Sequence, residues 1–204
     1  MKKKIGIIDL GLSNLGSICN AVKFCKAEPI LIKSFNQIQN YDHIILPGIG
    51  SYNLASKIIE KKKLKTYLRN FFEKKGKFFG ICLGMQLMFE SSNEYGDSKG
   101  MGFFKGKVSK FSGKKIKIPH VGFNVVKHDN HKIWKGVPRK SKFYFVHSYK
   151  VDKRINQKKI KYINCNYSKP FIAFVRNGNI FASQFHPEKS GDYGIKLLKN
   201  FIDF

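Results

Sequence analysis

The 204-residue sequence predicts an α/β protein with a mostly parallel central sheet that helices cover on both faces. One observation is that short apolar runs alternate with helical patterns through the first half of the chain. Alternation of this kind implies a parallel sheet that is buried on both sides. A second observation is that short strand-like segments dominate the second half, which adds antiparallel strands. We expect residues 1–204 to form one domain, since no repeat or linker divides them.

In the first half, the predicted strands are short and apolar, and they cover residues 5–8, 29–32, 43–46 and 77–81. After the first strand we predict a helix that Ser13 or Asn14 can cap. Its apolar positions share one face, and they are Leu15, Ile18, Val22 and Cys25. Residues 53–75 carry a second helical pattern, in one or two pieces. A further helix is expected to follow the fourth strand at once and to run through Met88.

In the second half, the predicted strands cover residues 105–110, 142–146, 160–166, 171–176 and 179–183. Asn177-Gly178, between the last two, is a strong signal of a tight hairpin. The chain ends in a predicted helix whose buried face carries Leu197, Leu198, Phe201 and Ile202. Residues 91–102 are expected to form a mobile loop.

The formal net charge of +26 is the most unusual property of the composition. Such a charge is compatible with binding to nucleic acid or to a membrane surface. However, only four of the 39 basic residues are arginine, the side chain that nucleic-acid sites favour, and the lysines are spread along the chain. We therefore interpret the charge as a general lysine bias and predict no nucleic-acid or membrane partner. Neither a bilayer-spanning stretch nor a signal peptide is recognisable, so we expect a cytoplasmic location.

One of the four cysteines has a context that favours chemistry. Cys82 lies in Gly80-Ile-Cys82-Leu-Gly84, directly after the fourth predicted strand, and this has the form of a strand-to-helix nucleophile elbow. The helix N-terminus would favour the thiolate, and the Leu83 backbone N–H would be free to bind an oxyanion. The alternative is a buried structural cysteine between turn glycines. Core packing is the predicted role of Cys19, Cys25 and Cys165, and no Cys-x-x-Cys pair indicates zinc.

A thiol nucleophile needs a base, and the base needs a group that orients it. His186-Pro187-Glu188 follows the last predicted strand. In an extended segment, residues two apart project to the same side, so the Glu188 carboxylate can hold one imidazole nitrogen while the other faces Cys82. The alternative is a surface histidine beside an unrelated glutamate. His120 and His147 lie in strand-like segments, where they are core or pocket residues.

With both motifs in this order, the chain resembles the class I glutamine amidotransferases. Within that family it is most similar to the glutaminase subunits of imidazole glycerol phosphate synthase. The matching segments span most of the chain, and they are residues 7–17, 46–50, 80–86, 118–124, 145–149 and 184–190. The fold implied is flavodoxin-like. The departures are Leu10, where the family usually has an aromatic residue, Gly16, where a larger residue is usual, and Phe123, where tryptophan is common.

The resemblance implies that Cys82 attacks the amide of L-glutamine, that His186 carries the proton and that Glu188 orients His186. It also implies a glutamine pocket lined by Gln86, Ser148 and Tyr149. The oxyanion hole would combine the Leu83 N–H with backbone groups at Gly48 and Gly50. Because glycines let a peptide rotate, we expect the hole to form only when the partner subunit is liganded.

The implied partner is a (β/α)8-barrel cyclase subunit, bound as a heterodimer, that receives ammonia through a channel. It would convert a ribonucleotide into imidazole glycerol phosphate and aminoimidazole carboxamide ribotide in histidine biosynthesis. The resemblance implies no metal and no organic cofactor. Two alternatives stay open at this point: a paralogous glutaminase that feeds a sugar-amidating enzyme of surface-polysaccharide synthesis, and a nucleic-acid-binding protein that uses the basic surface.

Overall fold

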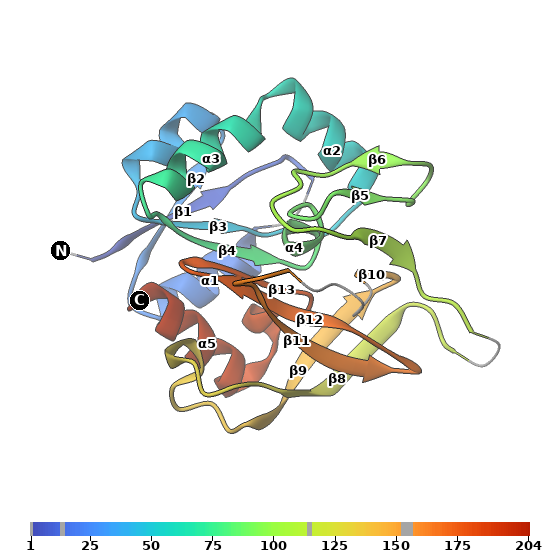
Figure 1. Cartoon of the computed structure of the whole chain (residues 1–204). Helices are drawn as coiled ribbons and strands as arrows, with labels where there is room; N and C mark the ends of the chain where they lie inside the picture. Colours follow the sequence, from blue (N-terminus) through green and yellow to red (C-terminus); the bar gives the residue numbers. More distant parts are fainter. Residues whose placement is uncertain (1, 13–14, 114–115, 152–156) are drawn as a thin grey trace.

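The computed structural model describes residues 2–12, 15–113, 116–151 and 157–204. Its centre is a seven-stranded sheet with the order β11-β12-β13-β4-β3-β1-β2 (Figure 1). Five neighbouring strands are parallel: β1 (Lys4–Ile8), β2 (Glu28–Ile32), β3 (His43–Leu46), β4 (Lys77–Ile81) and β13 (Ile180–Ser183). Antiparallel strands β12 (Lys169–Asn177) and β11 (Lys161–Tyr167) extend one edge. The predicted fold class is therefore confirmed.

Helices cover both faces of this sheet. In Figure 1, α2 (Tyr52–Lys61) and α3 (Leu64–Glu73) lie on one face, and α1 (Gly16–Phe24) and α5 (Gly191–Ile202) lie on the other. Successive residues of a strand point to opposite faces. Accordingly, Phe78 of β4 joins the core cluster under α2 and α3, and Phe79 joins the cluster under α1 and α5. Both rings are fully buried, so β4 anchors both layers.

Smaller elements extend the second half. One sheet contains β10 (Tyr149–Val151), β7 (Lys107–Lys110), β5 (Ser91–Ser92) and β6 (Ser98–Lys99). A two-stranded ribbon pairs β8 (His120–Lys127) with β9 (Lys140–His147). Short 3₁₀ helices are η1 (Phe35–Asn40), η2 (Lys132–Trp134) and η3 (Pro187–Lys189). None of the described helices is long and apolar enough to cross a membrane.

Several local predictions need correction. Strands β5 and β6 lie within the segment predicted as a loop. Strand β8 was indicated only by the strand-like segment around His120, with no predicted bounds, and β10 was not predicted. In the β12–β13 hairpin, Asn177 pairs with Ile180, so the turn is Gly178-Asn179, one residue later than predicted. Gly178 has φ +55, which glycine adopts without the cost that a Cβ atom brings. The predicted cap at Ser13 or Asn14 lies outside the described residues.

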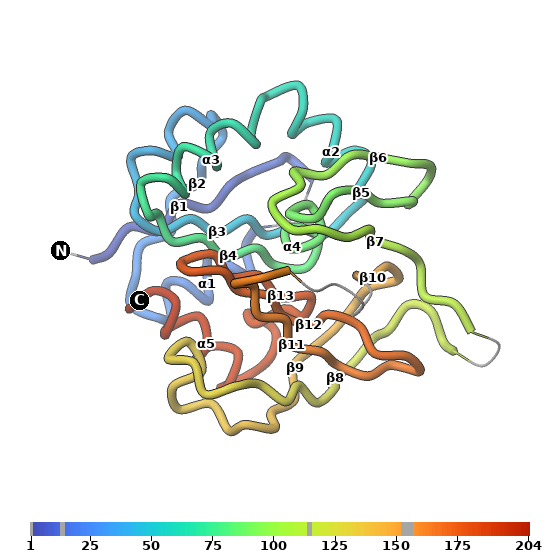
Figure 2. The backbone as a smooth tube through the Cα atoms, viewed as in Figure 1, coloured from blue at the N-terminus to red at the C-terminus, as the bar shows by residue number. Residues whose placement is uncertain are grey.

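The topology places the two predicted catalytic motifs side by side. Strands β4 and β13 are parallel neighbours, with Ile81 opposite Ser183. The chain therefore leaves both strands at the same edge of the sheet, as the tube in Figure 2 shows. Cys82 follows β4 directly and His186 follows β13 after two residues, so residues about a hundred positions apart meet at this edge.

Candidate active site

Cys82 occupies a sharp turn between β4 and α4 (Leu83–Gln86). Its φ of 52° and ψ of −105° are uncommon for a residue with a side chain, and such backbone conformations cluster at functional sites. The flanking glycines make the turn possible. A Cβ atom on Gly80 would lie 2.9 Å from the Gly84 carbonyl oxygen, and one on Gly84 would collide with the Leu46 carbonyl oxygen. The Gly-x-Cys-x-Gly pattern thus forms the elbow that was predicted.

Helix α4 is shorter than predicted. It ends at Gln86, and Leu87 and Met88 continue it only as turns, with the Met88 N–H donating to the Met85 carbonyl oxygen. The electrostatic contribution of the helix to a Cys82 thiolate is therefore that of one turn.

The backbone N–H of Leu83 also differs from expectation. The Leu83 N–H donates to the Gly48 carbonyl oxygen over 3.3 Å and is not free to bind an oxyanion in this conformation.

His186 and Glu188 are in direct contact. The Nδ1 atom of His186 lies 2.7 Å from the Glu188 carboxylate, and both side chains are more than nine-tenths buried. The route to this contact differs from the predicted one, because Pro187 starts the 3₁₀ helix η3 and the segment is not extended. Ser190 holds the turn, since its hydroxyl donates to the His186 carbonyl oxygen. Ser190 also accepts the Tyr144 N–H over 2.9 Å, which ties η3 to β9.

Opposing effects determine the charge of His186. Burial alone would lower its pKa, but nearby Cys82 and the Glu188 carboxylate outweigh burial and raise the pKa to about 10. Cys82 acts on the imidazole both through its charge and as a hydrogen-bond partner. The contact at Nε2 of His186 is not well aligned, because that atom makes no regular hydrogen bond to the described residues. The second carboxylate oxygen of Glu188 is likewise without a partner there. The raised pKa keeps His186 protonated at neutral pH, next to the sulfur of the proposed nucleophile.

Gln184 is a site residue that the sequence interpretation missed. It is fully buried, and its side-chain amide donates to Cys82 Sγ over 3.6 Å. Its carbonyl oxygen accepts from Gln86 Nε2 at 3.0 Å. The same Gln86 nitrogen donates to the Tyr149 carbonyl oxygen, also at 3.0 Å. Its position could have indicated this role, because it lies two residues before His186 and directly after the same strand.

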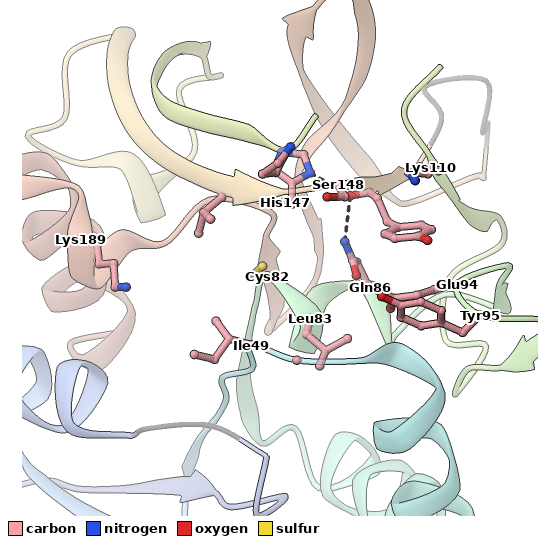
Figure 3. Close-up of a pocket in the computed structure, with 14 residues that line it drawn as sticks. Ile49, Cys82, Leu83, Gln86, Glu94, Tyr95, Lys110, His147, Ser148 and Lys189 are labelled. Atoms are coloured by element: carbon pink, nitrogen blue, oxygen red, sulfur yellow. Dashed lines mark hydrogen bonds between the residues drawn. The ribbon is translucent and has the colours of Figure 1, made fainter. Parts of the chain in front are cut away.

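A cavity of about 590 Å³ opens over Cys82 (Figure 3). Five of the predicted substrate-binding residues line it, and they are Gly50, Leu83, Gln86, Ser148 and Tyr149. The sixth, Gly48, lines a separate cavity of about 160 Å³ together with His186 and Glu188. The two cavities share Ile49 and Lys189, so the 47–50 loop and η3 form the wall between them.

The larger cavity also contains charged residues that were not predicted. In the part of the chain that the structure describes, Glu94 is the only acidic residue that lines it, and Lys110 and Lys189 are the basic ones. In Figure 3, Glu94 and Lys110 lie on the far side of Gln86 from Cys82. Glu94 is held in place because its carboxylate accepts the Tyr52 N–H over 2.7 Å. It comes from the segment interpreted as a loop, where an isolated glutamate gave no pattern to detect.

The remaining cysteines and the buried histidines lie outside the triad. Among the described residues, no three His, Cys, Asp or Glu side chains are grouped so as to hold a metal ion. Cys25 and Cys165 are buried and Cys19 is half-buried, consistent with core packing, and all three have a pKa raised by burial. His120 and His147 are both buried, and His147 lines the larger cavity.

Comparison with known proteins identifies the class. The family model described as "Glutamine amidotransferase class-I" matches residues 6–204, so the chain belongs to the class I glutamine amidotransferase family. Two solved structures share the fold. One is titled "Crystal structure of glutamine amidotransferase" (TM-score 0.75, 17% identity, covering 98% of this chain and 97% of that chain). The other is "Structure of PurLQS from Thermotoga maritima" (TM-score 0.74, 20% identity, covering 100% and 99%).

Relatives with higher identity carry a more specific name. The chain is 39% identical to "Imidazole glycerol phosphate synthase subunit HisH" of Helicobacter hepaticus, over 98% of each chain. It is 41% identical to the protein of the same name from Caldanaerobacter subterraneus subsp. tengcongensis, over 97% of this chain and 96% of that one. A protein of that name from Bacillus thuringiensis is 40% identical over 97% of this chain and 93% of the relative.

Proposed function

We propose that this protein is the glutaminase subunit of an imidazole glycerol phosphate synthase, and that Cys82, His186 and Glu188 hydrolyse L-glutamine. The observation that carries the chemistry is the buried contact of 2.7 Å between His186 and Glu188, together with the interaction of His186 with Cys82, which lines the larger cavity. The full-length similarity to subunits of that name supports the specific assignment over a sugar-amidating paralogue. We also propose that residues 1–204 act as a single amidotransferase domain, which the match over residues 6–204 supports.

In the first half of the reaction, the Cys82 thiolate attacks the side-chain amide carbon of glutamine. A C–S bond forms, and the carbonyl oxygen gains the negative charge of a tetrahedral intermediate. The imidazolium of His186 then gives its proton to the amide nitrogen, the C–N bond breaks, and ammonia leaves. A glutamyl thioester stays on Cys82. The Glu188 carboxylate holds Nδ1–H, so the mobile proton is the one on Nε2.

In the second half, water attacks the thioester. Neutral His186 accepts a proton from that water as the C–O bond forms, and the C–S bond then breaks. Glutamate is released, and the Cys82 thiolate and the His186 imidazolium are restored. The sum is glutamine plus water to glutamate plus ammonia. Gln184, which donates to the sulfur, stabilises its negative charge before attack and after release.

The cavity offers complementary charges to the amino-acid end of glutamine. With the amide at Cys82, the substrate would extend past Gln86 toward Glu94 and Lys110 (Figure 3). Glu94 would then bind the α-ammonium group and Lys110 the α-carboxylate. Since Glu94 is the only acidic residue among the described residues that line the cavity, it is the group that would distinguish glutamine from molecules without an amine.

The oxyanion hole is not assembled in this conformation, because Gly48 occupies the Leu83 N–H. Rotation of the peptide between Gly48 and Ile49 would remove that carbonyl group and direct the Ile49 N–H toward the cavity. Gly50, with φ +127, is a hinge that only glycine provides without strain. We propose that binding of the ligand by the partner subunit drives this rotation, which would prevent wasteful hydrolysis. A pair of crystal structures with and without that ligand, showing an unchanged loop, would contradict the rotation.

The partner in this proposal is a (β/α)8-barrel cyclase. The subunit naming of the relatives supports a second subunit, and the barrel cyclase is the finer part of the proposal. Three expectations stay predictions. They are that the protein is cytoplasmic, that it binds no nucleic acid and that it needs no cofactor.

The decisive experiment measures glutamate release from glutamine by this chain alone, and then with the cyclase and its ribonucleotide ligand. We expect a large stimulation that is absent in Cys82→Ala, while synthesis with added ammonium salts continues in the Cys82→Ala complex. Loss of both activities would make Cys82 structural. Hydrolysis that ignores the cyclase would keep the triad and favour a different partner, and no hydrolysis in any mixture would refute the proposed function.

A further inference from the structure

A chain of hydrogen bonds enters the proposed active site from two buried histidines that the mechanism does not use. Nδ1 of His147 lies 2.8 Å from the Tyr149 carbonyl oxygen. Nε2 of His147 lies 3.1 Å from Nδ1 of His120. Nε2 of His120 lies 3.5 Å from the side-chain amide nitrogen of Asn124. These contacts involve every ring nitrogen of both histidines, although only small fractions of the two residues are exposed.

The chemistry of the partners determines the tautomers. A carbonyl oxygen only accepts, so the proton of His147 must be on Nδ1. Burial lowers the pKa of His147 to about 3 and that of His120 to about 4, so both rings are neutral. Nε2 of His147 is therefore an acceptor, and His120 must donate from its own Nδ1. Its Nε2 is then left to accept from Asn124, whose amide nitrogen also donates to the Asn166 carbonyl oxygen over 2.8 Å.

The contact from His147 to Tyr149 bridges the point where one strand ends and the next begins. Strand β9 ends at His147 and β10 begins at Tyr149, with Ser148 between them. All three residues line the proposed glutamine cavity. The side chain thus bonds to the carbonyl group two residues ahead, while the Ser148 carbonyl oxygen accepts from the Phe111 N–H over 3.0 Å. These two bonds fix the path of the cavity wall.

The same Tyr149 carbonyl oxygen connects the histidines to the nucleophile. It accepts from Gln86 Nε2 as well as from His147. Gln86 in turn donates to Gln184, and Gln184 donates to Cys82 Sγ. We propose that His147, whose Nε2 accepts from His120, is a positioning residue that fixes the Tyr149 carbonyl group and through it the Gln86 and Gln184 amides beside Cys82. This inference rests on the proposed function, because its effect is on glutamine binding.

The test compares substitutions that keep or remove the Nδ1 donor. In His147→Phe the donor is lost, and we expect KM for glutamine to rise about tenfold, the effect of about one net hydrogen bond. In His147→Asn the side-chain amide can take the place of Nδ1–H, so KM should return to within about threefold of wild type. Both variants are measured in the complex, with ammonia-dependent synthesis as the check that the assembly is intact.

A matched control separates positioning from general core damage. Phe143→Leu changes a buried ring on the same strand, and that ring packs on Phe185 and Trp134 and not on either histidine of the pair. We expect it to lower the melting temperature without changing KM. His120→Leu should raise KM about threefold in wild type and add nothing in His147→Phe, because the two residues act through one contact.

Nuclear magnetic resonance reads the tautomers directly. Long-range ¹H–¹⁵N correlations should show both rings neutral at pH 6, each with its proton on Nδ1. A proton on Nε2 of His147 would overturn the proposal, as would an unchanged KM in a folded His147→Phe complex. Wild-type protein that hydrolyses no glutamine refutes the proposed function instead, so the two failures are distinguishable.

Discussion

The Leu83 amide donates to the Gly48 carbonyl oxygen over 3.3 Å, and this bond occupies the N–H group that we propose for the oxyanion hole. Cys82 lies directly before Leu83, and the carbonyl group that blocks the amide belongs to the loop after β3. In our proposal, Cys82, His186 and Glu188 are already together, so the loop is the part of the site that would still have to move. A partner subunit could therefore control hydrolysis by changing the orientation of the peptide between Gly48 and Ile49.

Gly50→Ala tests whether the loop must rotate. A Cβ atom at φ +127 costs on the order of 1–3 kcal/mol, and it would restrict the backbone next to the peptide that turns. Removing one oxyanion donor slows such reactions about a hundredfold or more, so we expect a loss of that order in ligand-stimulated glutamate release. The measurement is kcat in the complex, with ammonia-dependent synthesis expected to be unchanged.

Gly106→Ala is the matched control, because Gly106 also has φ +127 and does not line either cavity of the site. It should lose similar stability and keep full glutaminase activity. Equal activity in Gly50→Ala and Gly106→Ala would show that rotation of the loop is not needed.

Glu188→Gln tests the source of the charge on His186. The carboxylate and Cys82 together raise the pKa of His186 to about 10 against the effect of burial. Because the general acid must be protonated, kcat/KM should fall as the pH rises through that pKa. Glutamine cannot supply the negative charge, so the pKa falls and the basic limb of the profile moves to lower pH. We expect this shift together with a loss of activity of about a hundredfold or more. A basic limb at the same pH in both proteins would exclude Glu188 as its cause.

Sequence alone could predict those parts of the site that depend on neighbouring residues. The elbow around Cys82 needs glycine at positions 80 and 84, because the close approach of the backbone leaves no room there for a side chain. That requirement can be recognised from five consecutive residues of the sequence. The alternation of strands and helices likewise indicated that β4 is buried on both faces. His186 and Glu188 were paired correctly, although a 3₁₀ turn and not an extended segment joins them.

Other parts depend on contacts between distant segments, which local patterns do not encode. The blocked Leu83 amide depends on where the 47–50 loop lies after β3. Glu94 reaches the cavity only because β5 and β6 fold beside β7. Gln184 and Gln86 meet across 98 residues of sequence, so neither amide predicts the other.

His43→Leu tests the role of a buried histidine outside the site. Both ring nitrogens lack a hydrogen-bond partner among the described residues, and the ring packs edge-on against Phe201. Since unsatisfied polar groups are costly, leucine should leave the free energy of unfolding at pH 7.5 unchanged or raise it by about 1 kcal/mol. Chemical denaturation at that pH measures the change. A loss of more than about 2 kcal/mol would show that the imidazole makes a favourable interaction in the fold.

The same variant should alter the dependence of stability on pH. Burial, helped by the charges of Lys3 and Lys77, lowers the pKa of His43 from 6.5 to about 4. As the pH falls below 6.5, the unfolded chain takes up a proton that the folded chain does not bind until about pH 4. The free energy of unfolding therefore falls through this window, by on the order of 3 kcal/mol from His43. His43→Leu should make the fall smaller, and His120 and His147 should account for part of what is left. An unchanged slope would mean that His43 is protonated in the folded state.

The net charge of +26 leads to a prediction about nucleic acid. If the lysines are a general bias, binding to duplex DNA comes only from counterion release, so it should be detectable at about 20 mM salt and fall steeply with ionic strength. We expect no binding at micromolar protein in about 150 mM salt, where screening is strong. Fluorescence anisotropy with a labelled duplex measures this, and heparin, an unrelated polyanion, serves as the control and should show a similarly steep loss with salt. Submicromolar binding to DNA but not to heparin at 150 mM would instead indicate a dedicated nucleic-acid site on the lysine-rich surface.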